Sequence, residues 1–138
     1  MLILLGVKAS AQGNLQFNQV VNFNLTGSTN GQTGTLTIQT INITVPDNKV
    51  WKIESATCRI SSTVSPFVGS STNNNVYILL DNNLIGLVNI SSSLLTNQLL
   101  PIWIASGNHT IQLMASIIPT SQQQVYGLVS ALEFNVLP

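Results

Sequence analysis

The chain is short of charge. Of its 138 residues, four are Lys or Arg and four are Asp or Glu, so charged residues make up 6% and the formal net charge is zero. A neutral chain has no positive field to gather nucleic-acid phosphates and no negative field to gather cations. We therefore expect no nucleic-acid partner, no metal and no other cofactor.

Residues that carry acid–base or nucleophilic chemistry are scarce too. One cysteine, Cys58, cannot form an internal disulfide, and its setting beside Thr57 and Ile60 is typical of a small apolar residue in a strand. The only histidine, His109, lies in a turn-like Ser106–Thr110 stretch without a nucleophile motif, and one His with one Cys makes no recognisable zinc site. A hydrolytic carboxylate pair lacks suitable spacing among the four acidic residues, Asp47, Glu54, Asp81 and Glu133. The sequence thus predicts a protein that is not an enzyme.

Long apolar runs are missing, since no stretch approaches the ~20 residues of a membrane span. The longest N-terminal run, Met1–Val7, is followed by Lys8 and by Ala9-Ser10-Ala11 before Gln12, which has the small-x-small form that a signal peptidase cuts. The run is roughly half the usual length and no basic segment precedes it. We expect residues 1–11 to be the remnant of a signal peptide and the protein to be secreted or displayed at the cell surface. The alternative is a retained N-terminal strand, which would pack on a neighbouring subunit.

Uncharged polar residues fill the place of the missing charges. Asn, Gln, Ser and Thr make up about 40% of the chain, while 44% is hydrophobic. A chain of this length buries roughly two-thirds of its unfolded surface in one core. Residues 12–138 should form a single folded domain.

Alternation of apolar and polar residues predicts strands almost throughout and no helix. The phase of alternation slips near Gln39-Thr40, which indicates a β-bulge. Turns are expected at Pro46–Asn48, Asp81–Asn83 and Ser106–Asn108. About eight strands separated by such turns favour an all-β, two-sheet antiparallel sandwich of jelly-roll type.

The aromatic residues allow two interpretations. Placed in alternating strands, Trp51 and Trp103 fill the core, with Ile53, Leu132 and Phe134 as further core anchors. Alternatively, rings on the surface stack on sugars while amide side chains bind their hydroxyls, as in many β-sandwich lectins. The candidates for glycan stacking are Trp51, Trp103, Tyr77 and Tyr126.

Three segments carry a resemblance to a known group of proteins. These are Val45–Ala56 (VPDNKVWKIESA), Leu100–Gly107 (LPIWIASG) and Gly127–Val136 (GLVSALEFNV). They resemble small secreted β-sandwich, jelly-roll-like surface proteins of Bacteroidetes-type bacteria, whose leaders are similar to the one that ends Ser10-Ala11-Gln12. Similar domains occur in fibres and decoration proteins of phages that infect such bacteria. The motifs that carry the resemblance are structural, and the resemblance supplies no activity for this chain.

Assembly accounts best for this composition. Strands with uncharged faces can pack together without burying ions, and few charges remain to keep their edges apart. We expect a structural subunit of an extracellular or surface assembly, partnered by further copies of itself as a homo-oligomer, polymer or filament. The alternatives are a phage virion protein, as a capsid decoration or fibre, and a glycan-binding adhesin module.

Overall fold

A computed structural model describes residues 15–30, 32, 34–62, 75–89, 100–117 and 123–137. In these residues the chain forms eight strands and no helix, in keeping with its alternating sequence. The strands are β1 (Leu15–Ser28), β2 (Gly34–Val45), β3 (Lys49–Ser62), β4 (Asn75–Leu80), β5 (Asn83–Asn89), β6 (Ile102–Ile104), β7 (Gly107–Ile117) and β8 (Gln123–Val136). The predicted leader, residues 1–11, lies outside the described residues.

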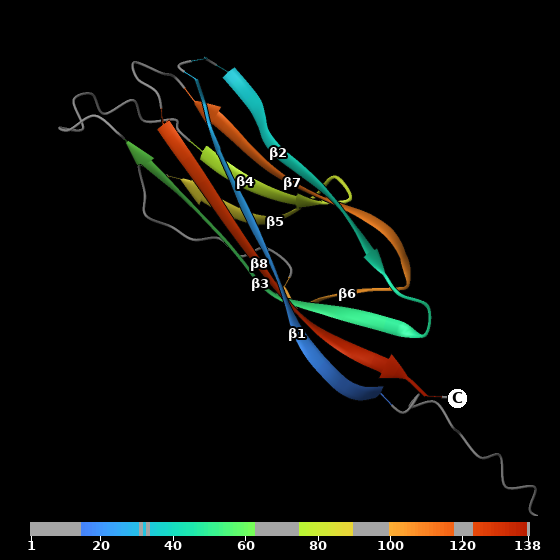
Figure 1. Cartoon of the computed structure of the whole chain (residues 1–138). Helices are drawn as coiled ribbons and strands as arrows, with labels where there is room; N and C mark the ends of the chain where they lie inside the picture. The colour runs from blue at the N-terminus through green and yellow to red at the C-terminus, as the bar shows by residue number, and fades with distance from the viewer. Residues whose placement is uncertain are drawn as a thin grey trace, which may run out of the picture.

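The strands form two antiparallel sheets that pack face to face (Figure 1). Sheet A has the order β1-β8-β3-β6 and sheet B the order β2-β7-β4-β5. The pairs β1·β8, β2·β7, β3·β6 and β4·β5 are nested, so the chain resembles one long hairpin folded across both sheets. This is the jelly-roll arrangement, and it confirms the predicted two-sheet sandwich.

The short turns between strands lie at the positions where the sequence has residues that favour turns. Asp81 and Asn82 both have positive φ, 48° and 65°, as the two-residue type I′ turn between β4 and β5 requires. At the turn between β2 and β3, Lys49 N–H donates to the Pro46 carbonyl at 3.2 Å. The register of β2 against β7 shifts between Thr37 and Gln39, next to the predicted bulge. Local sequence therefore specifies these connections.

The interior of sheet A is lined by the smaller residues of β8. Val125, Val129 and Ala131 are fully buried, and Gly127 faces the same way. A Cβ atom on Gly127 would lie 3.1 Å from Leu113 Cδ1 and 3.3 Å from Ile78 Cδ1, so the absence of a side chain lets sheet B approach closely.

Two of the predicted core anchors on β8 are placed wrongly by the sequence interpretation. Leu132 and Phe134 alternate with the buried residues and point to the outer face of sheet A, where they are half-buried. The prediction chose the larger residues of the strand. The close approach of the two sheets instead selects the smaller ones for the interior.

One of the two tryptophans is buried in the core, and the other is exposed on the surface. Trp51 and Ile53 lie in the core, at 6% and 0% exposure, as predicted. Trp103 is 50% exposed, so its assignment to the core is wrong. Its neighbours Ile102 and Ile104 point inward and pack on the core, which turns Trp103 outward on the short strand β6.

The described ranges contain no helix with the length and hydropathy of a membrane span.

Candidate functional site

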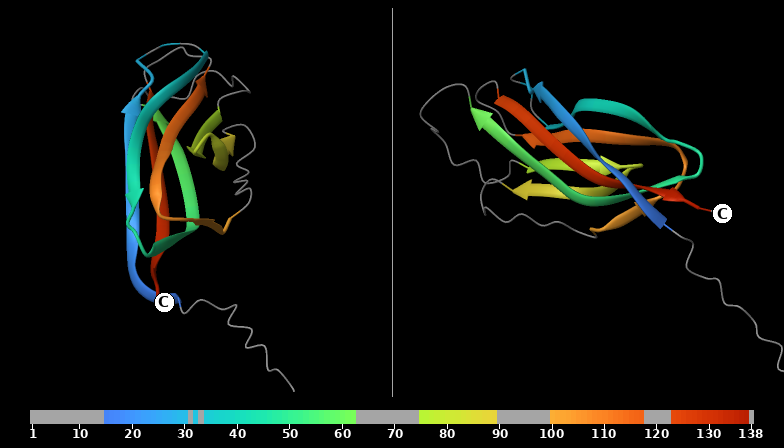
Figure 2. Two further views of the ribbon diagram at one scale, coloured as in Figure 1. Left: turned by 90° about the vertical axis from the view of Figure 1, so that its right-hand side faces the viewer. Right: turned by 60° about the horizontal axis from the view of Figure 1, so that its bottom comes forward.

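The two longest edge strands lie along the same side of the sandwich (Figure 2). β1 is an edge of sheet A and β2 an edge of sheet B, and the Thr26 N–H of β1 donates to Gln39 Oε1 of β2 at 2.7 Å. Neither strand contains a charged residue or a proline. Charges and prolines are what usually protect an edge from pairing with another chain. The opposite edges, β5 and β6, span only 7 and 3 residues.

The outer face of sheet A ends in an apolar patch. Phe134 on β8 contacts Phe17 on β1 edge-to-face, with ring centroids 6.1 Å apart, and Trp103 on β6 at 5.4 Å. Phe17 and Trp103 are each about half exposed, and Val20 extends the patch along β1. The apolar patch, defined by Phe17, Val20, Trp103 and Phe134, exposes on the order of 300 Å². An apolar patch of this size is common on monomeric proteins and is often functional.

The Lys52 side chain lies beside the apolar patch, and its charge is paired. Lys52 Nζ lies 5.8 Å from the centroid of the Trp103 ring and 2.6 Å from the Glu54 carboxylate. The cation therefore contacts the ring face while its charge is balanced by a neighbour two residues away. This end of sheet A presents a nearly neutral surface.

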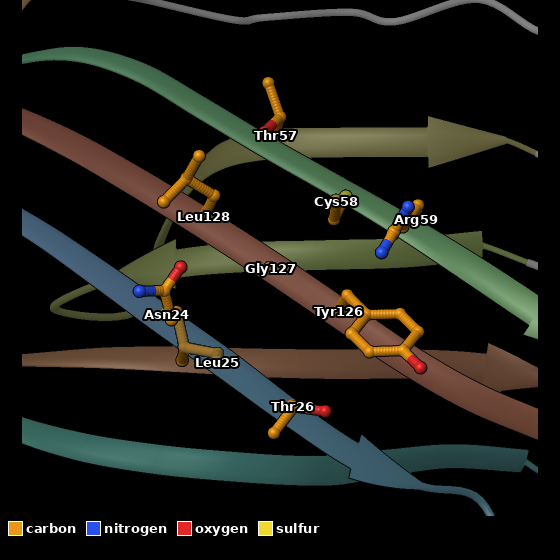
Figure 3. Close-up of a pocket in the computed structure, with 9 residues that line it drawn as sticks. All are labelled: Asn24, Leu25, Thr26, Thr57, Cys58, Arg59, Tyr126, Gly127 and Leu128. Atoms are coloured by element: carbon orange, nitrogen blue, oxygen red, sulfur yellow. The ribbon is translucent and has the colours of Figure 1, made fainter.

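A shallow hollow of about 640 Å³ lies farther along the same face (Figure 3). Its lining comes from the three neighbouring strands β1, β8 and β3. The Arg59 guanidinium lies 4.6 Å from the centroid of the Tyr126 ring. The other lining residues are uncharged: Asn24, Leu25, Thr26, Thr57, Cys58, Gly127 and Leu128. Such a hollow can accept an uncharged group beside an aromatic ring.

A buried carboxylate stabilises the end of sheet A that carries the apolar patch. Glu133 is 3% exposed and accepts hydrogen bonds from Trp51 Nε1 at 2.8 Å, from Gln19 Nε2 at 3.2 Å and from Asn18 Nδ2. Lys49 Nζ lies 3.3 Å from the carboxylate. Burial alone would raise the pKa of Glu133, but the hydrogen bonds from Asn18, Trp51 and Lys49, with the Lys49 charge, hold it below its usual range.

This carboxylate is a structural anchor. Glu133 lies on β8 and its partners come from β1 and β3, so it ties the beginning of β1 to the other two strands. In the sequence, Glu133 stands out only as a possible member of a carboxylate pair. The available signal was a single acidic residue in phase with Val129 and Ala131, which are buried.

The only histidine joins two connections at one end of sheet B. His109 Nδ1 lies 2.6 Å from Asp81 Oδ2, and Nε2 lies 3.0 Å from the Ala105 carbonyl oxygen. Because both partners are acceptors, the doubly protonated imidazolium is the form of the ring that donates to both. The Asp81 hydrogen bond raises the pKa of His109 against the opposing effect of burial. Both nitrogens are thus engaged in structure.

Two of the four predicted stacking residues share one face. Trp103 and Tyr126 both lie on the outer face of sheet A, at the apolar patch and the hollow respectively. Tyr77 lies half-buried on β4 of sheet B, and Trp51 is buried with its indole bonded to Glu133. Within the described ranges, no group of three or more His, Cys, Asp or Glu side chains could hold a metal ion.

Comparison of the chain with protein-family models, with curated proteins and with solved structures finds no match. The fold itself defines the class, which is an antiparallel jelly-roll sandwich.

Proposed function

We propose that the protein is a non-enzymatic structural subunit of an extracellular or cell-surface assembly, and that it self-associates through uncharged strand edges and faces. The observation that carries this proposal is the side of the sandwich formed by β1 and β2. These edge strands span 14 and 12 residues without a charge or a proline. Exposed edges of this kind are templates for pairing with another chain.

The outer face of sheet A supports the same proposal. It carries the apolar patch at one end, and the charge of Lys52 there is balanced by Glu54. Two such patches can meet without leaving the Lys52 charge unpaired, a cost that reaches several kcal/mol. The likeness to small secreted proteins of Bacteroidetes-type bacteria supports placement outside the cell.

A virion role is an alternative form of the same proposal. The jelly roll also serves viral capsids, and such a protein would likewise act by assembly. Capsid or tail genes beside the coding sequence would favour this alternative, and genes for exported bacterial surface proteins would count against it.

Glycan binding is a second candidate function, because Trp103 and Tyr126 lie on one face together with a mainly apolar hollow to which Asn24, Thr26 and Thr57 add amide and hydroxyl groups. A glycan array tests it with the variants Trp103→Ala and Tyr126→Ala. Tyr77→Ala, on the other sheet, is the matched control. Binding that Tyr77→Ala reduces as strongly as the other two variants would argue against a site on sheet A.

Sedimentation velocity and negative-stain microscopy of the purified chain test the structural role. We expect species larger than a monomer whose amount grows with concentration and changes little between low and high ionic strength, because neutral surfaces are not screened. A strictly monomeric protein at high concentration would overturn the proposal.

A further inference from the structure

We infer that two copies of this chain pair through the free edge of β1, antiparallel about a twofold axis at Asn22, so that sheet A continues from one copy into the other. This inference rests on the proposed function and names the edge, the partner and the register. Two observations support it. The first is the direction in which the N–H and C=O groups of β1 point, and the second is the pair of positions at which this edge is blocked from pairing.

Backbone direction follows from one hydrogen bond. The Thr26 N–H donates to the Gln39 side chain, so it points away from β8. Residues of an antiparallel strand alternate between pairs that exchange hydrogen bonds and pairs that do not. The register of β1 against β8 is continuous from Gln19 to Ser28. The N–H and C=O groups of Val20, Asn22 and Asn24 therefore point to the free edge as well.

Among the described residues, β8 is the only strand that pairs with β1. Val20 is 53% exposed, and Asn22 and Asn24 are also exposed. The edge between Val20 and Asn24 thus offers three residues with outward-pointing donors and acceptors.

Both ends of this open edge are blocked from pairing, at positions equally distant from Asn22. At one end the Thr26 N–H already donates to the Gln39 side chain. On the other side the register shifts between Phe17 and Gln19, and the extra residue, Asn18, turns its side chain to Glu133. Thr26 and Asn18 lie at equal distances along the chain from Asn22. The open segment is therefore centred on Asn22.

A segment closed in this way is self-complementary. In an antiparallel pair centred on Asn22, Val20 of one copy lies opposite Asn24 of the other, and the two Asn22 residues face each other. The three residue pairs exchange about six backbone hydrogen bonds, and the facing amides can bond to each other. No charge lies in β1 to oppose this arrangement. A second copy is therefore the partner that this edge fits, through an isologous contact.

A cysteine placed on the proposed axis tests the register. Facing residues in a hydrogen-bonded pair have Cα atoms about 5.5 Å apart, within the range that a disulfide bridges. We expect Asn22→Cys to yield a covalent dimer on mild oxidation. Asn24→Cys is the matched control, because the two copies of that position would lie at least about 13 Å apart along the strands. Cys58 is buried in both variants.

A charge placed on the edge or on the face separates this inference from the general proposal. Asn22 on β1 and Ser130 on β8 are neighbours on the outer face of sheet A. We expect Asn22→Lys to abolish association in sedimentation velocity and Ser130→Lys to leave it unchanged. Circular dichroism of both variants verifies that they fold.

The outcomes are distinguishable. A chain that associates but is disrupted by Ser130→Lys and not by Asn22→Lys, or that crosslinks equally well through Asn24→Cys, overturns the edge pairing and leaves the structural role standing. A chain that is monomeric at all concentrations overturns both.

Discussion

Trp51 and Glu133 are direct cross-strand neighbours on β3 and β8, joined inside the sandwich by a 2.8 Å hydrogen bond from the indole N–H to the carboxylate. The carboxylate is almost fully removed from water, and its charge is balanced by Lys49. A buried carboxylate is costly unless it is paired and hydrogen-bonded, and here donors from two neighbouring strands satisfy it. This end of sheet A is therefore sensitive to changes in a single carboxylate.

Replacing Glu133 by Gln should lower the free energy of unfolding by about 2 to 4 kcal/mol, because Lys49 loses its counter-ion and one oxygen acceptor becomes a donor. Denaturant unfolding followed by circular dichroism measures the change. The control is Glu54→Gln, which breaks a more exposed ion pair with Lys52 and should cost less than about 1 kcal/mol. Equal costs for the two variants would contradict an anchoring role for Glu133.

Stability should fall as the pH rises through the raised pKa of His109. The folded-state pKa of His109 lies above the ordinary value of 6.5, so its contribution is full below that value and is lost at higher pH. The pKa of Asp81 is lowered: burial opposes this, but the hydrogen bonds from His109 and Thr110 outweigh it. Its contribution is present above 3.8 and is lost as the pH falls through the lowered value.

Melting temperature measured from mildly acidic to mildly alkaline pH checks this prediction, with His109→Gln as the control. The effect should be below about 1 kcal/mol, since the Asp81 side chain is 42% exposed. A His109→Gln variant with the same alkaline fall would show that another group is responsible.

The two tryptophans should report different environments. Trp103→Phe leaves the buried Trp51, whose fluorescence should be blue-shifted and poorly quenched by acrylamide. Trp51→Phe leaves the half-exposed Trp103, whose emission should be red-shifted and readily quenched. The second variant should also lose about 2 to 4 kcal/mol of stability, because the Glu133 carboxylate loses a donor, whereas the first should lose less than about 1 kcal/mol. Similar spectra from the two variants would contradict the outward placement of Trp103.

Gly127→Ala should destabilise the sandwich by about 1 to 3 kcal/mol, because the added methyl group meets Leu113 and Ile78 from sheet B. Leu113→Val provides space at that point but leaves a small cavity on its own. We expect the double variant to lose less stability in chemical denaturation than the sum of the two single variants. A strictly additive result would show that the two positions do not touch.

Much of the fold could be predicted from local sequence. Alternation marks the strands, and Asp81-Asn82 has the residue types that tolerate positive φ. The inward face of β8 could not be predicted, because both phases of its alternation are apolar and residue size favours the wrong one. What selects the smaller residues is the distance between the sheets, a property of the assembled fold.

The candidate site was predicted less well for a related reason. Trp103 lies between Ile102 and Ile104, and three apolar residues in a row do not reveal which one faces outward. The neutrality of the edges was evident from the sequence, but which strands form the edges depends on long-range pairing. Among the described strands β1 pairs only with β8, which lies far along the chain, and this long-range pairing leaves β1 at an edge.

The central position of β8 has a consequence for biosynthesis. β8 lies between β1 and β3 in sheet A, yet it is the last of the described strands to be made. Until Val136 has left the ribosome, β1 and β3 lack the strand that joins them, and β1 exposes uncharged edges to other nascent chains. Sheet A must therefore form after translation of this region, and slowly, because its pairings close the longest loops in the chain. A chaperone that shields β1 during this interval would be expected to raise the yield of folded protein.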